Sequence, residues 1–171
     1  MFNSVTCCVS FNFRGAYHFG HPSIDPAAQA KYFVDTVGAL GDGEVMVLDI
    51  EVASSNASLH SAQDVASWSK DFVDAVCAFA NIPPSRVLIY TGAWFWNPQT
   101  GGSGVCSDHP LWVSGYTSSP PMPGGWSDWT FWQFTDKAQI AGISGGVDCS
   151  YFHGFNEDLA AWMKRARIVS V

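Results

Sequence analysis

Basic residues are scarce in this sequence. Eight Lys and Arg stand against fifteen Asp and Glu in 171 residues, which gives a formal charge of −7 at pH 7. A short basic cluster runs from Lys164 to Arg167, where cations at the carboxyl end of a helix would stabilise its dipole. We therefore give that cluster a structural role, and nucleic acid is not an expected partner.

Long apolar runs are also lacking. No stretch approaches the roughly 20 apolar residues that span a bilayer, so a membrane is not an expected partner. The opening residues, MFNSVTCCVSFNF, have no basic start and no clear small-residue cleavage site, and they do not predict a signal peptide. The cellular compartment stays open.

Cysteines are few and odd in number: Cys7, Cys8, Cys77, Cys106 and Cys149. They show no CxxC or Cys/His spacing, so no metal site is expected. Cys106 and Cys149 lie near predicted loops, where they would either pair in an oxidising compartment or remain free thiols. The sequence also lacks GxGxxG and GxxxxGK[ST], which removes the common nucleotide cofactors. No cofactor is expected.

Aromatic residues, in contrast, are abundant. The chain has twelve Phe and eight Trp, and 47% of its residues are hydrophobic. This composition is typical of a packed globular protein, and the length suits one domain. Trp and Tyr in excess of what a core needs commonly line a binding cleft.

Strands alternate with helices in the first half of the predicted structure. This alternation favours parallel βα units, in a barrel or a doubly wound sheet, and the strand-rich second half favours an irregular barrel. Loops are expected at 98–104 and 118–125. The expected strands are 14–19, 45–51, 86–91, 111–116, 130–134 and a short one near 147–148. Three helices are expected: one that starts at Asp25, one that starts at Ser61, and one at about 156–167.

Apolar spacing and end signals define these helices. Asp25 and Pro26 begin the first helix and Gly41 ends it, while Ser61 caps the second, which runs to Ala80. The residues expected to be buried are Ala30, Phe33, Val37 and Leu40 in the first, Val65, Trp68, Phe72, Val76 and Phe79 in the second, and Leu159, Trp162 and Met163 in the last.

Two carboxylates end the buried strand VMVLDIE. Asp49 and Glu51 are two residues apart, so they project from the same face, about 6 to 7 Å apart along the strand. In an enclosed site they repel, and one tends to stay protonated. Such a pair, one acid and one carboxylate, is what glycoside hydrolysis requires. The carboxyl end of a barrel strand is also where catalysis is expected. The alternatives for this pair are a solvated strand end or a magnesium-type site.

Seven segments stand in the order found in the family 25 glycoside hydrolases, the Chalaropsis-type lysozymes. They are RGAYHFGHP, DPAAQAKYFVDTV, VLDIE, VLIYTGAWFW, LWVSGY, FWQFTD and GVDCSYFHG, and together they cover about Arg14 to Gly154. This chain resembles that family over most of its length. The resemblance implies an irregular β/α barrel and cleavage of the β-1,4 bond between N-acetylmuramic acid and N-acetylglucosamine in peptidoglycan, a substrate that lies outside the cell.

The resemblance also implies roles for individual residues. Glu51 resembles the general acid, and we expect its pKa to be raised. Asp49 resembles the neighbour that positions the substrate N-acetyl group or stabilises charge, and Asp148 resembles the acidic residue of the last strand. The residues that resemble or suit the lining of the sugar cleft are Tyr17, Tyr90, Trp112 and Gln133.

Each of the less central residues has an alternative role. Asp148 would equally suit a loop or a cap, Trp112 would suit the core, and Gln133 would suit a buried backbone group that needs a partner. His18 and His21 flank the same region without metal spacing, so we expect structural or hydrogen-bonding roles for both.

The beginning of the chain departs from the family. Members normally carry a strand with an Asp-Val-Ser type motif and a second with a Lys-Ala-Thr-Glu type motif before the equivalent of RGAYHF, and residues 1–13 contain neither, nor any Asp or Glu. We expect a divergent segment at 1–13 and a single hydrolase domain at 14–171. Its fold would be an irregular TIM-like β/α barrel, truncated at its N-terminus and lacking the first two strands, with open edges that favour self-association.

Two other functions remain open at this stage. Without a first-strand Asp the chain would serve as a glycan-binding module with impaired catalysis. A different barrel hydrolase with a DxE strand, such as a chitinase-like enzyme, would explain the carboxylates but not the motifs around Gln133 and Asp148.

Overall fold

A computed structural model describes residues 13–41, 43–51 and 62–165, and these form one six-stranded sheet with helices. The strands are β1 (Arg14–Phe19), β2 (Glu44–Asp49), β3 (Val87–Thr91), β4 (Leu111–Ser114), β5 (Phe131–Ala138) and β6 (Val147–Phe152). The helices are α1 (Pro26–Val37), α2 (Ala62–Ala80), α3 (Ala93–Thr100) and α4 (Asn156–Arg165), with a 3-10 turn at Pro84–Arg86.

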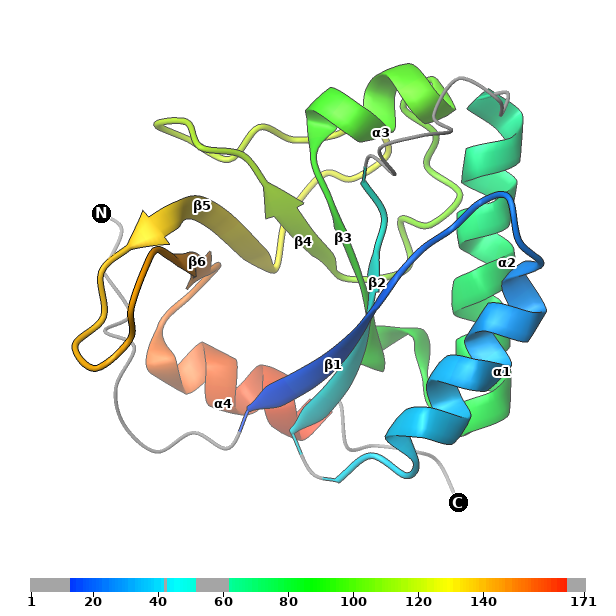
Figure 1. Cartoon of the computed structure of the whole chain (residues 1–171), viewed down its shortest axis with the longest axis horizontal. Helices are drawn as coiled ribbons and strands as arrows, with labels where there is room; N and C mark the ends of the chain where they lie inside the picture. The colour runs from blue at the N-terminus through cyan, green and yellow to red at the C-terminus, as the bar shows by residue number, and fades with distance from the viewer. Residues whose placement is uncertain (1–12, 42, 52–61, 166–171) are drawn as a thin grey trace.

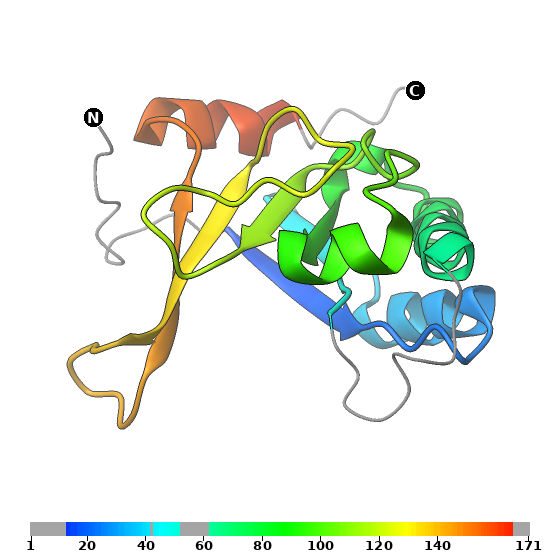
Figure 2. The same ribbon diagram turned by 90° about the horizontal axis from the view of Figure 1, so that it is seen from above.

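The sheet follows chain order, β1-β2-β3-β4-β5-β6. Strands β1 to β5 are parallel, and β6 is antiparallel to β5. The sheet curls into a half-barrel, with α1, α2 and α3 on its convex side and α4 beneath its concave side (Figures 1 and 2). The predicted α/β class and parallel βα units are confirmed at this level.

The end signals of α1 act largely as predicted. The Asp25 side chain accepts a hydrogen bond from the Ala28 amide at 2.7 Å, and Pro26 is the first helical residue. The helix ends at Val37, however, because Gly38 has a φ of 74°, a non-helical conformation that glycine adopts more readily than other residues. The expectation that it would continue to Gly41 was wrong, and Leu40 packs against the core from beyond the helix.

Helix α2 supplies the longest apolar stripe. Val65, Trp68, Phe72 and Val76 are buried in the cluster on the convex side of the sheet. Phe79 was expected in this stripe but is 48% exposed. The last turn presents other residues to the core, Cys77 and Ala80 among them, so the stripe drifts away from Phe79. Ser61, the predicted cap, lies outside the described residues.

Helix α3 replaces part of a predicted loop. Pro98 was taken to start a loop, yet the helix runs to Thr100 with Pro98 inside it. Phe95 and Trp96 are buried on the convex side, and the Thr100 hydroxyl donates to the Trp96 carbonyl at 2.7 Å. Tertiary burial of these two rings outweighs the lost proline hydrogen bond.

The end of the sheet differs most from expectation. Strands β5 and β6 are longer than predicted and form a hairpin with register shifts near Thr135, which extends away from the body (Figure 2). Helix α4 ends at Arg165, the last described residue. Leu159 and Trp162 were expected to be buried, and they are half-buried against the sheet. The side chain of Met163 is not among the described ones.

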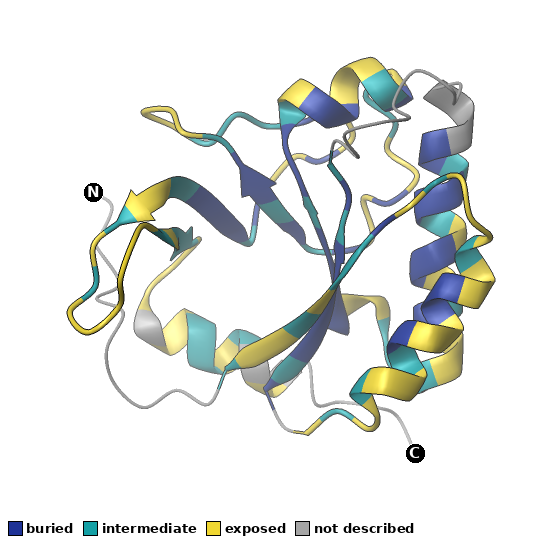
Figure 3. Cartoon of the chain, viewed as in Figure 1, coloured by how far each residue is buried: buried dark blue, intermediate teal, exposed yellow. Residues whose placement is uncertain are grey.

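The two faces of the sheet bury different sets of side chains, because alternate strand residues point in opposite directions. Met46, Leu48 and Ile89 pack toward the helices, and Figure 3 shows the helices buried on that side and exposed on the other. The concave face holds a second group, the concave cluster, formed by Val45, Val47, Leu88 and Phe131 with Phe13, Tyr90, Trp112, Phe152, Leu159 and Trp162.

Candidate active site

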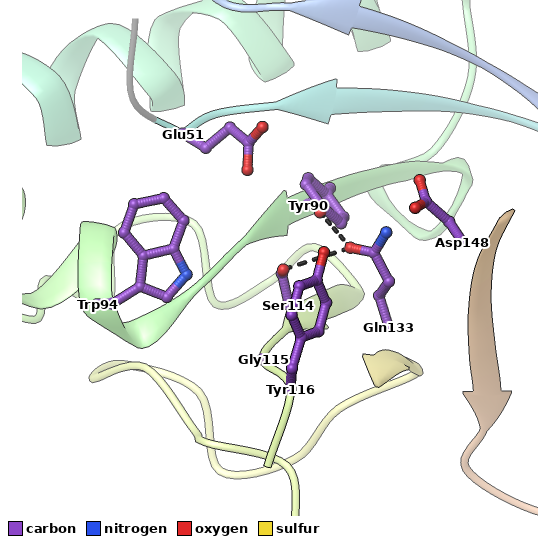
Figure 4. A pocket seen from close by; sticks show the side chains of 8 residues that line it. All are labelled: Glu51, Tyr90, Trp94, Ser114, Gly115, Tyr116, Gln133 and Asp148. Atoms are coloured by element: carbon purple, nitrogen blue, oxygen red, sulfur yellow. Dashed lines mark hydrogen bonds between the residues drawn. The ribbon is translucent and has the colours of Figure 1, made fainter. Parts of the chain in front are cut away.

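An open cleft of about 400 Å³ lies above the carboxyl ends of β2, β3 and β4, where a parallel β/α fold places its chemistry. It opens at the polar end of the concave face, beyond the concave cluster. The lining residues, drawn in Figure 4, are Glu51, Tyr90, Trp94, Ser114, Gly115, Tyr116, Gln133 and Asp148.

Two carboxyl groups face this cleft from distant parts of the chain. Glu51 follows β2 by two residues, and Asp148 is the second residue of β6. Because β6 is antiparallel to β5, its beginning reaches the end of the sheet where the parallel strands finish. The two side chains lie on opposite sides of the cleft in Figure 4, and the charge of Asp148 contributes to a raised pKa at Glu51.

Asp49 is the last residue of β2, half-buried, and is not among the residues that line the cleft. Burial and then the nearby Glu51 charge raise its pKa from 3.8 to about 7. One carboxylate oxygen, Oδ1, is buried, and no described residue donates a hydrogen bond to it. An unpaired buried oxygen favours the neutral form of the acid.

The pKa of Glu51 is also raised, by burial first and by Asp148 second. We expected one of the two adjacent carboxyls to hold its proton near neutral pH, and both are shifted in that direction. The pKa of Asp49, the more deeply buried of the two, is raised to about 7.

A hydrogen-bonded group occupies the middle of the cleft. The Tyr90 hydroxyl and the Ser114 hydroxyl both donate to Oε1 of Gln133, the second at 3.3 Å. Gln133 is only 4% exposed, and burial raises the pKa of Tyr90, which keeps its phenol protonated. The side chain of Gln133 thus engages two hydroxyl groups, a different arrangement from the backbone partner considered from sequence.

Two exposed aromatic residues form walls that the sequence analysis did not single out. Trp94 is 53% exposed and Tyr116 is 56% exposed, although both line the cleft. Trp94 folds back over Gly92, where a β-carbon would lie 2.1 Å from the indole nitrogen. Glycine at this position therefore permits the indole to reach the cleft. Both residues stand within motifs already noted, TGAWFW and LWVSGY, directly after strand ends.

Tyr17 and Trp112 lie outside the cleft lining. The Trp112 indole donates to the Ser150 hydroxyl at 3.0 Å, and its ring meets Tyr90 edge-on at 5.6 Å. Trp112 belongs to the concave cluster and supports Tyr90 from below. Tyr17 is 70% exposed on β1. Sugar binding by these two residues stays a prediction.

The histidines have the structural environment expected of them. His18 Nε2 lies 2.9 Å from Oε1 of Gln29, and its ring stacks on Phe72. Gln29 also accepts from the backbone N–H of His21 and donates to its carbonyl. These contacts fix the loop between β1 and α1.

Cys106 and Cys149 are both free thiols, so the disulfide considered from sequence is not formed. Cys106 is buried in the convex core cluster, whereas Cys149 lies on β6 opposite Thr135. Across the described ranges, no three His, Cys, Asp or Glu side chains are grouped to hold a metal ion. No described helix is both long and apolar enough to cross a membrane.

A family model connects the chain to known proteins. The model of glycosyl hydrolases family 25 matches residues 12–143, which include Asp49, Glu51 and Gln133 and end before Asp148. Lysozyme M1 of Streptomyces globisporus is 37% identical over 149 residues, and the match covers 82% of this chain and 50% of that protein. The N,O-diacetylmuramidase of Chalaropsis sp is 34% identical over 158 residues, with coverage of 85% and 74%.

Solved structures share the fold. The bacterial lysozyme from Streptomyces coelicolor has a TM-score of 0.80 at 33% identity, covering 90% of this chain and 73% of its own. The muramidase from Acremonium alcalophilum has a TM-score of 0.77 at 32% identity, with coverage of 90% and 74%. This chain spans about half the length of Lysozyme M1 and about three quarters of these two structures.

Proposed function

The chain belongs to glycosyl hydrolases family 25, and from its site we propose that it cleaves the β-1,4 bond between N-acetylmuramic acid and N-acetylglucosamine in peptidoglycan. The observation that carries this proposal is the pair of carboxyl groups, Glu51 and Asp148, facing each other across an open cleft with aromatic walls. A polymer can lie across such an opening, and the names of the relatives point to the same substrate.

Glu51 is the proposed general acid. A general acid must reach the leaving oxygen first and have a suitable pKa second. Glu51 lines the cleft and its pKa is raised, whereas Asp49 is more deeply buried and is not among the lining residues. Access therefore supports Glu51 as the proton donor, with Asp49 as its neighbour.

Asp49 is proposed to support the substrate's own N-acetyl group. In this mechanism the acetamido carbonyl oxygen bonds to the anomeric carbon as the glycosidic bond breaks, and Glu51 protonates the leaving oxygen. A carboxylate beside the acetamido N–H would orient the group and stabilise its developing positive charge. Water then opens the cyclic intermediate, with Glu51 accepting a proton, and the product retains its anomeric configuration.

The anomeric outcome is the test of this mechanism. Proton NMR of the first products, recorded before mutarotation, is expected to show the β-anomer. An initial α-anomer would instead mean inversion, in which one carboxylate activates water opposite the acid. Asp148, on the far side of the cleft from Glu51, would then be the base.

Four residues are proposed to bind sugar in addition to the acids. Tyr90 and Gln133 were expected from sequence, and the exposed rings of Trp94 and Tyr116 supply apolar walls against which sugar faces stack. Trp112 holds the Tyr90 ring in place. Tyr17 lies on the concave side of β1 in register with Val47, so a contact from it would be to a more distant part of the glycan.

We also propose that the half-barrel corresponds to an irregular TIM-like barrel and that residues 14–171 form one domain. No described strand covers the outer edge of β1. Its support is the parallel order of β1 to β5 and the coverage of the two solved structures. An uncovered strand edge can pair with another chain, so self-association is expected to appear in light scattering at raised protein concentration.

A glycan-binding module without catalysis remains the competing function. A turbidity assay on bacterial cell walls, with release of reducing ends as the second readout, separates the two. Lysis by the wild-type chain that is lost in Glu51→Gln supports the hydrolase. Cell-wall binding without release of reducing ends by either protein would support the binding module.

A further inference from the structure

The hydrogen bonds of Gln133 define what its amide can offer to a ligand. An amide has one acceptor oxygen and one donor nitrogen with two N–H groups. Oε1 of Gln133 already accepts from the hydroxyls of Tyr90 and Ser114. The nitrogen therefore faces the other way, and Figure 4 shows it directed away from both hydroxyls, on the side of Asp148.

This donor is fixed in place. Gln133 is 4% exposed and Ser114 is 5% exposed, and the register of β4 and β5 pairs the two residues directly. Tyr90 stays a protonated donor because burial raises its pKa. A side chain held at one end by two hydroxyls loses little further freedom when its other end binds a ligand.

The chemistry of the glycan limits the acceptor that this donor can select. Sugar hydroxyls both donate and accept, so a fixed N–H does not discriminate between them. Acetamido carbonyls and carboxylates only accept. The described cleft lining contains Glu51 and Asp148 but no Lys or Arg, so it repels a carboxylate. The neutral acetamido carbonyl is the acceptor that suits this position.

Resting on the proposed function, we propose that Gln133 makes the cleft specific for N-acetylated sugars by donating Nε2–H to an acetamido carbonyl, with Tyr90 and Ser114 as its positioning residues. The carbonyl belongs to a sugar next to the one being cleaved, since the acetamido group of the cleaved sugar attacks its own anomeric carbon. Selectivity for the acetyl group thus comes from a residue separate from the acids.

Binding of two neutral oligosaccharides tests this role. In a Glu51→Gln background, which prevents turnover, calorimetry gives the Kd of N-acetylchitotetraose and of cellotetraose, whose sugars carry a hydroxyl in place of the acetamido group. The parent is expected to prefer the acetylated ligand. Gln133→Glu, which keeps an oxygen for Tyr90 and Ser114 but presents no donor, should reduce that preference about tenfold.

Three further variants isolate the amide donor. Gln133→Met removes the donor without adding charge and should reduce the preference by a similar factor. Gln139→Glu adds the same charge at an exposed position beyond the site and should leave the preference unchanged. Tyr90→Phe removes one hydroxyl and should lower the preference severalfold, a change in selectivity that a purely structural role would not produce.

The outcomes separate this inference from the proposed function. A preference that stays the same in Gln133→Glu and Gln133→Met, in proteins that still melt cooperatively, overturns the role of Gln133 even if the wild-type chain lyses walls. Binding of neither oligosaccharide by the folded parent also overturns it. A preference that depends on Gln133, in a chain that releases no reducing ends, supports the inference and removes the hydrolase.

Discussion

The concave face of the sheet has two halves that are built from the same strands and differ in chemistry. Its lower half is the concave cluster, which is apolar and filled by rings. Its upper half is the cleft, which is polar and open. On each strand the side chains change from apolar to polar within two positions. These pairs are Val47 and Asp49, Leu88 and Tyr90, Trp112 and Ser114, and Phe131 and Gln133.

The fold holds Asp49 and Glu51 next to packed aromatic rings. The ring of Trp112 touches Phe131 and Tyr90, so the floor of the cleft is packed against side chains that cannot rearrange freely. Burial raises the pKa values of Asp49 and Glu51 first, and the charges of Glu51 and Asp148, respectively, raise them further.

The largest expected effect is that of a substitution in the cleft, which should change activity and leave stability unchanged. Glu51→Gln should lower the rate of wall hydrolysis by about 10²- to 10⁴-fold, because it removes the proposed proton donor while keeping the shape of the side chain. The free energy of unfolding should change little. Glu157→Gln, at an exposed position on α4, is the matched control and should retain full activity. Equal rates for Glu51→Gln and the wild type would exclude Glu51 as the acid.

Phe131→Ala should act on the lower half. Phe131 contacts Phe13, Trp112, Phe152 and Trp162, so its removal leaves a cavity that costs about 3–5 kcal/mol of unfolding free energy. Guanidinium unfolding measures it. Removal of an exposed ring, in Phe155→Ala, should cost less than about 0.5 kcal/mol. Similar costs for both variants would mean that the concave cluster does not stabilise the fold.

The pH dependence of stability connects the halves. In the unfolded chain Asp49 ionises near 3.8, and in the folded chain near 7, so ionisation favours the unfolded state as the pH rises between these values. Asp49→Asn should therefore stabilise the protein at pH 8 by about 1–2 kcal/mol, a figure reduced for partial exposure, and have no such effect below pH 3.8. Urea unfolding at several pH values checks this, and a gain that grows toward low pH would contradict it.

The smallest expected effect concerns the cleft wall. Gly92→Ala places a methyl group where the Trp94 indole lies, so the ring must move and KM should rise severalfold with kcat nearly unchanged. In a Trp94→Ala background the same substitution should have little further effect on KM. Additive effects of the two substitutions would show that Gly92 acts through something other than the indole.

Much of the fold follows from local sequence signals. The span of β1 and the start of α1 were predicted closely, because the aromatic strand run and the Asp25-Pro26 cap depend on neighbouring residues. Helix α3 and the full length of β5 and β6 were not predicted. Burial of Trp96 and the pairing of two distant strands stabilise these elements, and neither is visible in a short window of sequence.

The site was predictable in its residue types more than in its arrangement. Glu51, Tyr90, Gln133 and Asp148 do line one cleft. Asp49 and Trp112 are not among the lining residues. The edge-on contact of the Trp112 ring with Tyr90 depends on how neighbouring strands pair in the sheet. The wall residue Trp94 depends on a fold-back over Gly92, a tertiary contact that periodicity does not encode.

The direction of β6 brings the tip of the β5–β6 hairpin close to one side of the cleft. The hairpin tip at 139–146 leads into Asp148 after one further residue, while the concave cluster is reached only at the other end of the strand, at Phe152. Residues inserted at this tip would extend one bank of the cleft without disturbing the packed floor. Under the proposed function, a library varied at this tip is expected to change which glycans the cleft binds while the scaffold stays the same.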